Sequence, residues 1–318
     1  MNMQKKNAPK VTVIVPNYCH SRYLRQRLDS ILTQTYTDFE LIILDDASPD
    51  EGASREVIEQ YRSNQHVTHI IYNEQNSGST FKQWHKGFEL SKGEYIWIAE
   101  SDDYCEPTFL EEVMTCYGRF PQSVVVTSRS ISVDENSKEI FPREHYSDMA
   151  ASYDGKIFIR EKLLCSNFFV TNASSVVFKR EVAISLPNIY MEYKASGDRL
   201  FWILMAERGD MTLLDRPLNY FRQHQNKVSP RRESDGTQCR ENYSICQYIH
   251  KKGYVPFIYR CQEFVFYWSY MQTAHFASED LRHELITLWF PNKTLYNKFT
   301  YRLAYRLVQM TIGKGLYL

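Results

Sequence analysis

The sequence has no apolar stretch that is long enough to span a lipid bilayer. Its longest aromatic stretch without charge, Phe264 to Ser278, is too short and too polar for that purpose. The opening residues, MNMQKKNAPK, lack the apolar core of a secretory signal peptide. We therefore expect a cytoplasmic protein that is at most peripheral at the inner face of the membrane.

The chain also lacks a surplus of charge of either sign, because its 38 basic and 38 acidic residues cancel. This balance argues against a nucleic-acid partner and leaves only local sites for polyanions. The seven cysteines are odd in number and include no CxxC pair, which favours reduced thiols over a disulfide framework or a zinc site. A hydrophobic content of 43% over 318 residues is ample for a globular core.

The first 130 residues alternate apolar strands with helical patterns. Ser21 is expected to cap the first helix, and Pro107 is expected to start the fourth. This alternation predicts an α/β fold with a mainly parallel, Rossmann-like sheet and helices on both faces. The predicted strands are residues 11–15, 39–44, 67–72, 95–99 and 124–128.

Polar or turn-forming loops follow the first four predicted strands: PNYCH, DDASPD, NEQNSGS and ESDDY. Ligands of doubly wound sheets bind at the carboxyl ends of the strands. Because four such loops are polar here, the sequence predicts one pocket at that edge.

The pattern changes after about residue 130. Residues 131–140 indicate a hairpin, residues 141–156 a polar loop, and residues 196–210 a helix between strands at 174–178 and 211–214. Beyond Pro230 the pattern is helical and aromatic. We expect one domain over residues 1–230, with a nucleotide-binding half (10–130) and an acceptor half (131–230), followed by a helical C-terminal region over residues 231–318.

Two pairs of adjacent carboxylates follow predicted strands. Asp102 and Asp103 repel each other unless a cation, a donor-rich ligand or water compensates them, and Mg²⁺ or Mn²⁺ carrying a diphosphate would do so. A solvated turn before a helix explains the same pair. Asp45 and Asp46 form the second pair; Asp46 could accept a hydrogen bond from a nucleobase, whereas an Asx-turn is the structural alternative.

Several motifs together resemble the family 2 glycosyltransferases of the GT-A fold. They are VTVIVPNYCHSRYLRQRLDSILTQTYTDFELIILDDASPDEG, NSGS, GEYIWIAESDDY and SGDRLFW, in that order. The family contains inverting enzymes of bacterial surface-polysaccharide synthesis. The resemblance covers roughly residues 10–225 and implies a transferase (EC 2.4) that moves a sugar from a nucleotide-diphosphate donor, a UDP-sugar, to a glycan or lipid-linked acceptor.

The resemblance implies nucleotide contacts at the loops of the predicted pocket. Asp46 matches the residue that reads the base, Gly78 lies in a loop near the nucleotide, and Lys82 is its charged neighbour. Asp102 is directed to the ribose. The full set of nucleotide-binding residues is Pro16, Asn17, Tyr18, Asp46, Gly78, Lys82 and Asp102.

The resemblance also implies a cofactor, Mg²⁺ or Mn²⁺, held by Asp103 with Asp102 and His224. Glu100 stands near the position of the family's first aspartate, so it is a further candidate for substrate or metal contact. Arg222 and His224 form an Arg-x-His element, in which Arg222 would clamp phosphate. A surface histidine after an edge strand is the alternative for His224.

Asp198 matches the general base of the family. Inverting transfer needs a carboxylate that takes the proton of the acceptor hydroxyl. A helix cap is the alternative for Asp198. Trp202, one turn further on, is a candidate sugar contact, although its helical phase equally fits a core aromatic.

The sequence also leaves other functions and partners open. A catalytically degenerate nucleotide-sugar-binding protein or a sugar nucleotidyltransferase has a related fold, although the loop PNYCHSR lacks the glycine-rich pattern of the latter. A phospho-receiver module is disfavoured by the chain length. The C-terminal helices could complete the core, pair subunits in a homo-oligomer or rest on a membrane.

Overall fold

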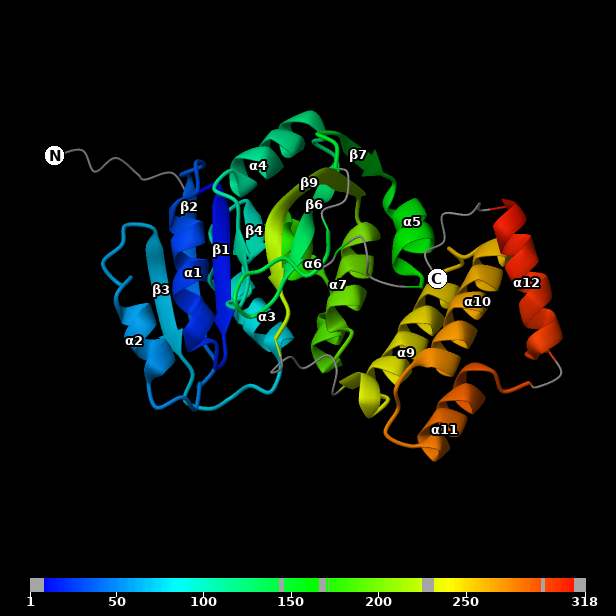
Figure 1. Ribbon diagram of the computed structural model, residues 1–318. Coiled ribbons are helices and arrows are strands. Elements are labelled where there is room, and N and C mark those ends of the chain that lie inside the picture. Colours follow the sequence, from blue (N-terminus) through cyan, green and yellow to red (C-terminus); the bar gives the residue numbers. More distant parts are fainter. Residues whose placement is uncertain are drawn as a thin grey trace. The chain divides into compact units, whose positions relative to one another are not determined.

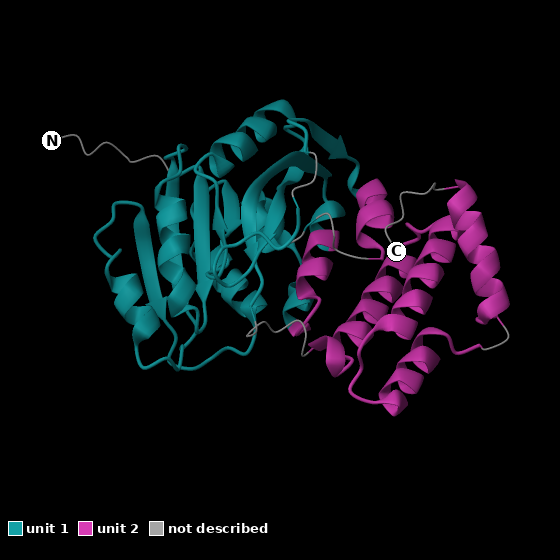
Figure 2. Ribbon diagram, viewed as in Figure 1, with its two compact units in different colours: residues 1–155, 169–191, 204–224 teal, residues 156–168, 192–203, 225–318 magenta. Residues whose placement is uncertain are grey.

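The protein is described here by a computed structural model that covers residues 9–142, 146–165, 170, 172–224, 232–292 and 295–311. The chain forms two compact units (Figure 2). Unit 1 contains Met1–Gly155, Phe169–Met191 and Leu204–His224, and unit 2 contains Lys156–Phe168, Glu192–Ile203 and Gln225–Leu318. Unit 2 thus groups two earlier segments with the C-terminal helices. The domain boundary expected at residue 230 stays a prediction.

Unit 1 is built on a sheet that has nine strands among the described residues (Figure 1). Its order is β3-β2-β1-β4-β8-β6-β9-β5, and β7 also pairs with β9. The strands are β1 Val11–Asn17, β2 Phe39–Asp45, β3 Val67–Tyr72, β4 Tyr95–Ile98, β5 Tyr104–Cys105, β6 Ser123–Val133, β7 Ala150–Tyr153, β8 Val176–Lys179 and β9 Asp210–Arg222.

The sheet is mixed but mainly parallel, as predicted. Strands β1 to β4 pair in parallel, and so do β6 and β9. Strand β8 lies antiparallel between β4 and β6, which leaves β6 running in the same direction as β4. Every residue of β1 and β2 is buried, because helices cover both faces of this part of the sheet.

The helices of unit 1 lie on both faces of the sheet. Helices α1 (Ser21–Leu32), α2 (Ala53–Glu59) and α4 (Phe109–Arg119) pack with Val13 and its neighbours on one face. Helix α3 (Thr80–Leu90) packs on the other face, where Gly87 lies directly against Ile14. Helix α6 of this unit is Arg180–Ser185. The short helix α5, Gly155–Phe158, begins at the last residue of the first segment of unit 1 and continues in unit 2.

Local boundaries differ from the sequence-based prediction at three places. Helix α1 begins at Ser21, so Ser21 is not its cap, and the preceding His20 makes no side-chain capping bond either. Helix α4 begins at Phe109, just after Pro107. The polar loop predicted over 141–156 is wrong in part, because residues 150–153 form β7 along β9. The hairpin at 131–140 is confirmed by an antiparallel bridge between Val133 and Glu139.

Unit 2 is helical, as expected for the C-terminal region. Its core contains Cys246, Tyr267, Met271 and Leu285, and Tyr267 stacks on Trp289 with ring centroids 3.8 Å apart. All seven cysteines are free thiols. No helix in the described part of the chain is long and apolar enough to cross a membrane. The main helices are α9 Thr237–Lys251, α10 Phe257–Thr273, α11 Glu279–Trp289 and α12 Lys298–Thr311.

Shorter elements join these parts. Helix α7, Gly197–Ala206, begins in unit 2 and ends in unit 1. A π-helical turn spans Ile159–Leu163, and 3₁₀ turns span Ala173–Ser175 and Asn188–Glu192.

Candidate functional site

Hydrogen bonds link the loops at the carboxyl edge of the parallel strands. Asn17, at the end of β1, donates from Nδ2 to Asp45 Oδ2 of β2 at 2.7 Å. His20, in the loop after β1, has its Nδ1 2.9 Å from the Oγ of Ser101, which follows β4. The parallel register of β1, β2 and β4 therefore brings the polar loops to one edge, as the sequence predicted.

Asp45 braces the loop that follows β2. Its carboxylate accepts hydrogen bonds from the Ser48 backbone N–H at 3.0 Å and from the Ser48 hydroxyl at 2.8 Å, besides the bond from Asn17. The bonds resemble the Asx-turn that the sequence left as the alternative, but they reach the third residue after Asp45 instead of the second. Asn17 is buried and holds Asp45, so it fixes this loop, and its contact with a nucleotide stays a prediction.

Asp46 is buried and organises the loop after β3. Its Oδ1 accepts from Asn73 Nδ2 at 2.6 Å, from the Ser77 backbone N–H at 2.9 Å and from Gln83 Nε2 at 2.8 Å. The Ser77 hydroxyl donates to Oδ2 at 2.7 Å. The carboxylate thus fixes the NSGS loop, and reading of a base by Asp46 stays a prediction.

The remaining predicted nucleotide contacts surround the same edge. Tyr18 is 44% exposed, whereas Pro16 is buried within β1. Gly78 is exposed and has φ +73°, a left-handed conformation that favours glycine. The ammonium of Lys82 donates to the Ser77 carbonyl oxygen at 3.1 Å. Gly78 and Lys82 therefore shape one loop, and their contact with a nucleotide stays a prediction.

Asp103, in the loop between β4 and β5, is almost completely buried. Its Oδ1 accepts from the backbone N–H of Arg222 at 2.9 Å, and Oδ2 accepts from Asn172 Nδ2. Burial, with repulsion from Asp102 next in size, raises the pKa of Asp103. Both carboxylate oxygens accept hydrogen bonds within the protein, so Asp103 ties the acidic loop, residues 100–103, to β9. The role of Asp103 as a metal ligand stays a prediction.

Glu100 lies beside the same pair. Its Oε1 accepts from Trp84 Nε1 at 2.9 Å, and its backbone N–H donates to Ser174 Oγ at 3.1 Å. Burial, followed by repulsion from Asp102, raises the pKa of Glu100 to about 8. The role of Glu100 as a substrate or metal contact stays a prediction.

Arg222 is fully buried and does not reach out as a phosphate clamp. Its Nε donates to the carbonyl oxygen of Asp102 at 2.7 Å, and its Nη2 donates to Gln26 Oε1 at 2.6 Å. Its Nη1 donates to the carbonyl oxygens of Asp134 and Glu135 at 3.1 and 3.2 Å. These bonds give Arg222 a structural role within the protein, and the phosphate contact suggested by the Arg-x-His element stays a prediction.

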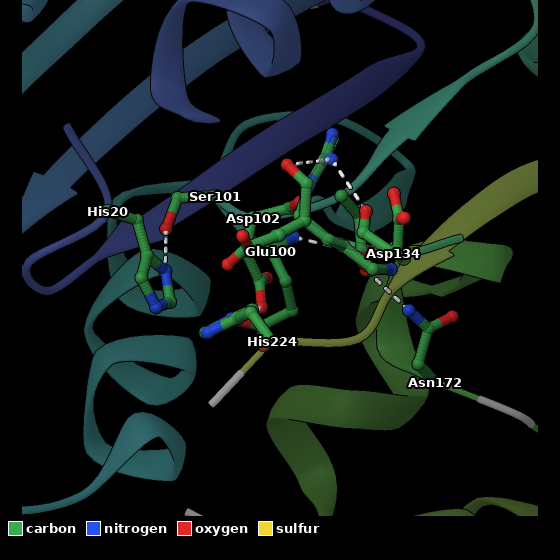
Figure 3. A network of polar contacts seen from close by, with 11 residues as sticks. His20, Glu100, Ser101, Asp102, Asp134, Asn172 and His224 are labelled. Atoms are coloured by element: carbon green, nitrogen blue, oxygen red, sulfur yellow. Dashed lines mark hydrogen bonds and ion pairs between the residues drawn. The ribbon is translucent and has the colours of Figure 1, made fainter. Parts of the chain in front are cut away.

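His224 lies against Asp102, with Nε2 3.0 Å from Oδ2 (Figure 3). The ring of His20 stands edge-on to His224, with centroids 5.3 Å apart. One potential ligand atom from each of His20, Asp102 and His224 lies within 4.8 Å of the other two. Two imidazoles and a carboxylate form a donor set that suits a divalent ion. Of the predicted ligands, the structure brings Asp102 and His224 together in this cluster, and it adds His20.

Asp198 and Trp202 belong to unit 2. Asp198 is in the first turn of α7, where a carboxylate is favoured by the helix dipole, and its Oδ1 accepts from the Arg199 backbone N–H at 2.7 Å. Trp202 is 0% exposed and packs edge-on against Phe201 at 4.9 Å. The buried ring has no face for a sugar, so the structure supports the core alternative for Trp202.

The sequence reasoning missed His20 and Asn172. His20 carried a usable signal, because it stands in the polar loop after the first strand, and that strand neighbours the one before Asp102. Asn172 carried none, since only folding brings it to Asp103. Residues 225–231, which follow His224, lie outside the described residues.

The family model "Glycosyl transferase family 2" matches residues 12–186, more than half of the chain. The chain belongs to this family. The match contains β2 to β4, all of β1 except Val11, and the polar loops at the carboxyl ends of these strands, and it stops before Asp198 and His224.

Curated relatives of this family member include GlyA, a glycosyltransferase of Streptococcus pneumoniae, which is 37% identical over 32% of this chain and 14% of GlyA. TarP of Staphylococcus aureus, a poly(ribitol-phosphate) β-N-acetylglucosaminyltransferase, is 33% identical over 38% of this chain and 36% of TarP. An uncharacterized glycosyltransferase of Nostoc is 28% identical over 68% and 65%. The chain therefore spans less than two thirds of the length of these relatives.

Solved structures share the fold across nearly the whole chain. The crystal structure of S. aureus TarS residues 1–349 in complex with UDP-GlcNAc has a TM-score of 0.65, 17% identity, and covers 94% of this chain and 88% of TarS 1–349. The UDP complex of the same fragment has a TM-score of 0.57 at 18% identity, over 92% of this chain and 73% of the fragment. This likeness confirms the GT-A-like fold with C-terminal helices.

Proposed function

We propose that this protein is a metal-dependent, inverting glycosyltransferase that uses a UDP-sugar. Its acceptor would be a hydroxyl of a glycan or lipid-linked molecule in bacterial surface-polysaccharide synthesis. The observation that carries the proposal is the cluster of Asp102 with His224 and His20 at the carboxyl edge of a family 2 sheet. The complex of TarS with UDP-GlcNAc and the N-acetylglucosaminyltransferase activity for which TarP is named support the donor class.

The reaction is a single displacement. The acceptor oxygen forms a bond to the anomeric carbon while the bond from that carbon to the diphosphate oxygen breaks, and the acceptor proton passes to a carboxylate. We assign that carboxylate to Asp198, on its match to the family motif. Asp102 and His224 would hold a divalent cation, whose charge stabilises the departing diphosphate. Asp46 and Asn17 fix the loops on which the nucleoside would lie.

Asp198→Asn separates binding from chemistry. The variant should bind UDP with Mn²⁺ as the wild type does, because Asp198 is not assigned to the nucleotide, and it should lose release of UDP from the donor. Binding is measured by isothermal titration, and turnover by UDP release. Asp215→Asn, a change of another partly buried aspartate that pairs with Arg129 at 2.8 Å, is the matched control. Full turnover in Asp198→Asn would remove it as the base.

A catalytically degenerate binding protein is the second candidate. The observation behind it is Glu100, which stands where the family's first aspartate is expected and is directed to Trp84. Such a protein would bind UDP-sugar and never cleave it with any acceptor or with water. No observation favours a sugar nucleotidyltransferase.

Helix α12 is proposed to rest on an anionic membrane surface. Phe299, Leu303 and Met310 are 74%, 61% and 77% exposed, while Arg302 and Arg306 are exposed on the same helix, which carries no acidic residue. Apolar side chains among basic ones are the pattern of interfacial helices. This placement would bring the enzyme to lipid-linked acceptors.

A further inference from the structure

Three chain segments that are far apart in sequence each supply one side chain to a compact group. His20 comes from the loop between β1 and α1, Asp102 from the loop after β4, and His224 from the segment just after β9 (Figure 3). The Nε2 of His224 and the Oδ2 of Asp102 are 3.0 Å apart. Two atoms that each lie roughly 2.1 Å from one ion, at right angles to each other, are separated by about 3 Å. The spacing therefore suits two ligands of one cation.

The orientation of His20 is fixed from behind. Its Nδ1 lies 2.9 Å from the hydroxyl of Ser101, and Ser101 is only 1% exposed. A histidine that binds a metal through one ring nitrogen usually makes a hydrogen bond through the other. The contact with Ser101 is of that kind, and it leaves Nε2 as the ligand atom to which we assign the cation.

The backbone that carries Asp102 and His224 is equally fixed. The buried guanidinium of Arg222 donates to the Asp102 carbonyl oxygen at 2.7 Å, and the Arg222 backbone N–H donates to Asp103 at 2.9 Å. Arg222 thus ties the acidic loop to β9, two residues before His224. The ligands are held in place before any ion binds, which lowers the ordering cost of binding.

We propose that His20 is a direct ligand of the divalent cation, together with Asp102 and His224, and that this site prefers Mn²⁺ and similar transition ions to Mg²⁺. The inference rests on the proposed function of the site. Mg²⁺ favours oxygen ligands and retains its waters, whereas imidazole suits first-row transition ions. Since His20 follows the loop PNYC, the cation would also connect the predicted nucleoside loop to the acidic loop.

The ligating nitrogens can be counted in the unmodified protein. Electron spin-echo spectroscopy of bound Mn²⁺ detects directly coordinated ¹⁴N, so the full chain with Mn²⁺ alone should show two histidine nitrogens. His20→Gln should show one, and its Mn²⁺ affinity should fall at least about tenfold. Its Mg²⁺ affinity should fall less. One nitrogen in the wild type, or unchanged Mn²⁺ affinity in His20→Gln, would overturn the inference.

His69→Gln is the matched control, because His69 is a partly buried histidine on the edge strand β3 and contacts Thr68 at 3.1 Å. It should bind Mn²⁺ as the wild type does. The measurement needs no sugar donor. Binding of Mn²⁺ through two histidines without cleavage of any nucleotide-sugar would uphold the inference and refute the proposed function. Cleavage of a UDP-sugar by the wild type, together with unchanged Mn²⁺ affinity in His20→Gln, would uphold the proposed function and refute the inference about His20.

Discussion

The segment before α7 is held by one carboxylate, and loss of that carboxylate is expected to reduce turnover. Glu241, on α9, accepts three backbone hydrogen bonds within unit 2: from Lys194 at 2.7 Å, from Ala195 at 2.9 Å and from Ser196 at 2.8 Å. Asp198 follows directly in the first turn of α7. Glu241 is therefore a positioning residue for the proposed base.

The size of the effect follows from these contacts. A hydrogen bond to a charged group contributes about 1.5–3 kcal/mol when water cannot replace it. Water can replace the bond at Lys194, which is exposed, and less readily the bond at Ser196, which is buried. Glu241→Ala should thus lower the free energy of local opening of residues 194–196 by roughly 2–4 kcal/mol. Turnover should then fall at least about tenfold, while UDP affinity is retained.

Hydrogen exchange and UDP release measure the two halves of this prediction. In Glu241→Ala the amides of residues 194–196 should exchange faster. Glu284→Ala is the control, since Glu284 lies in the same unit and makes an exposed ion pair with Arg240 at 2.8 Å that contributes little. Unchanged exchange in Glu241→Ala, or faster exchange with wild-type turnover, would refute the reasoning.

Three further predictions concern packing and the membrane. Gly87→Ala should lower the free energy of unfolding by about 1–3 kcal/mol, because the added Cβ would meet the Ile14 side chain at 2.6 Å. Gly118→Ala on α4 has open space around the added Cβ and should raise the free energy of unfolding by up to about 1 kcal/mol. Urea denaturation that gives the opposite order of stability would contradict this packing. Arg222→Met should lower the free energy of unfolding by about 1–3 kcal/mol by the same assay, because the buried carbonyl oxygen of Asp102 would lose its donor. An unchanged urea midpoint would show that this bond does not stabilise the contact between the loop after β4 and β9. Phe299→Glu should reduce cosedimentation with anionic vesicles, and equal cosedimentation would exclude α12 as the contact.

The parallel half of the sheet could be predicted because its signals are local. The run Val11 to Val15 and its counterparts are continuous and apolar, and polar loops mark their ends. Strand β7, with sequence AASY, has no such signal and forms through its pairing with β9. The two-residue strand β5 is likewise fixed by its pairing with β9.

The loops that form the candidate site could be predicted from the sequence, whereas the contacts of the individual side chains were harder to predict. The positions of Asp46 and Asp102 followed from the strand ends. Arg222 looked like a phosphate clamp in sequence, because nothing local shows that Asp102 and Gln26 lie within its reach. Such partners are more than 100 residues away along the chain, so only the folded sheet reveals them.

We propose above all that this protein transfers the sugar of a UDP-sugar with the help of a divalent ion. The direct measurement is release of free nucleotide from a panel of UDP-, GDP- and dTDP-sugars, with Mn²⁺ and with a chelator. We predict UDP release from at least one UDP-sugar that depends on Mn²⁺ and is lost in Asp198→Asn. Absence of release from every UDP-sugar with Mn²⁺ present, or release that the chelator and Asp198→Asn leave unchanged, would contradict this function.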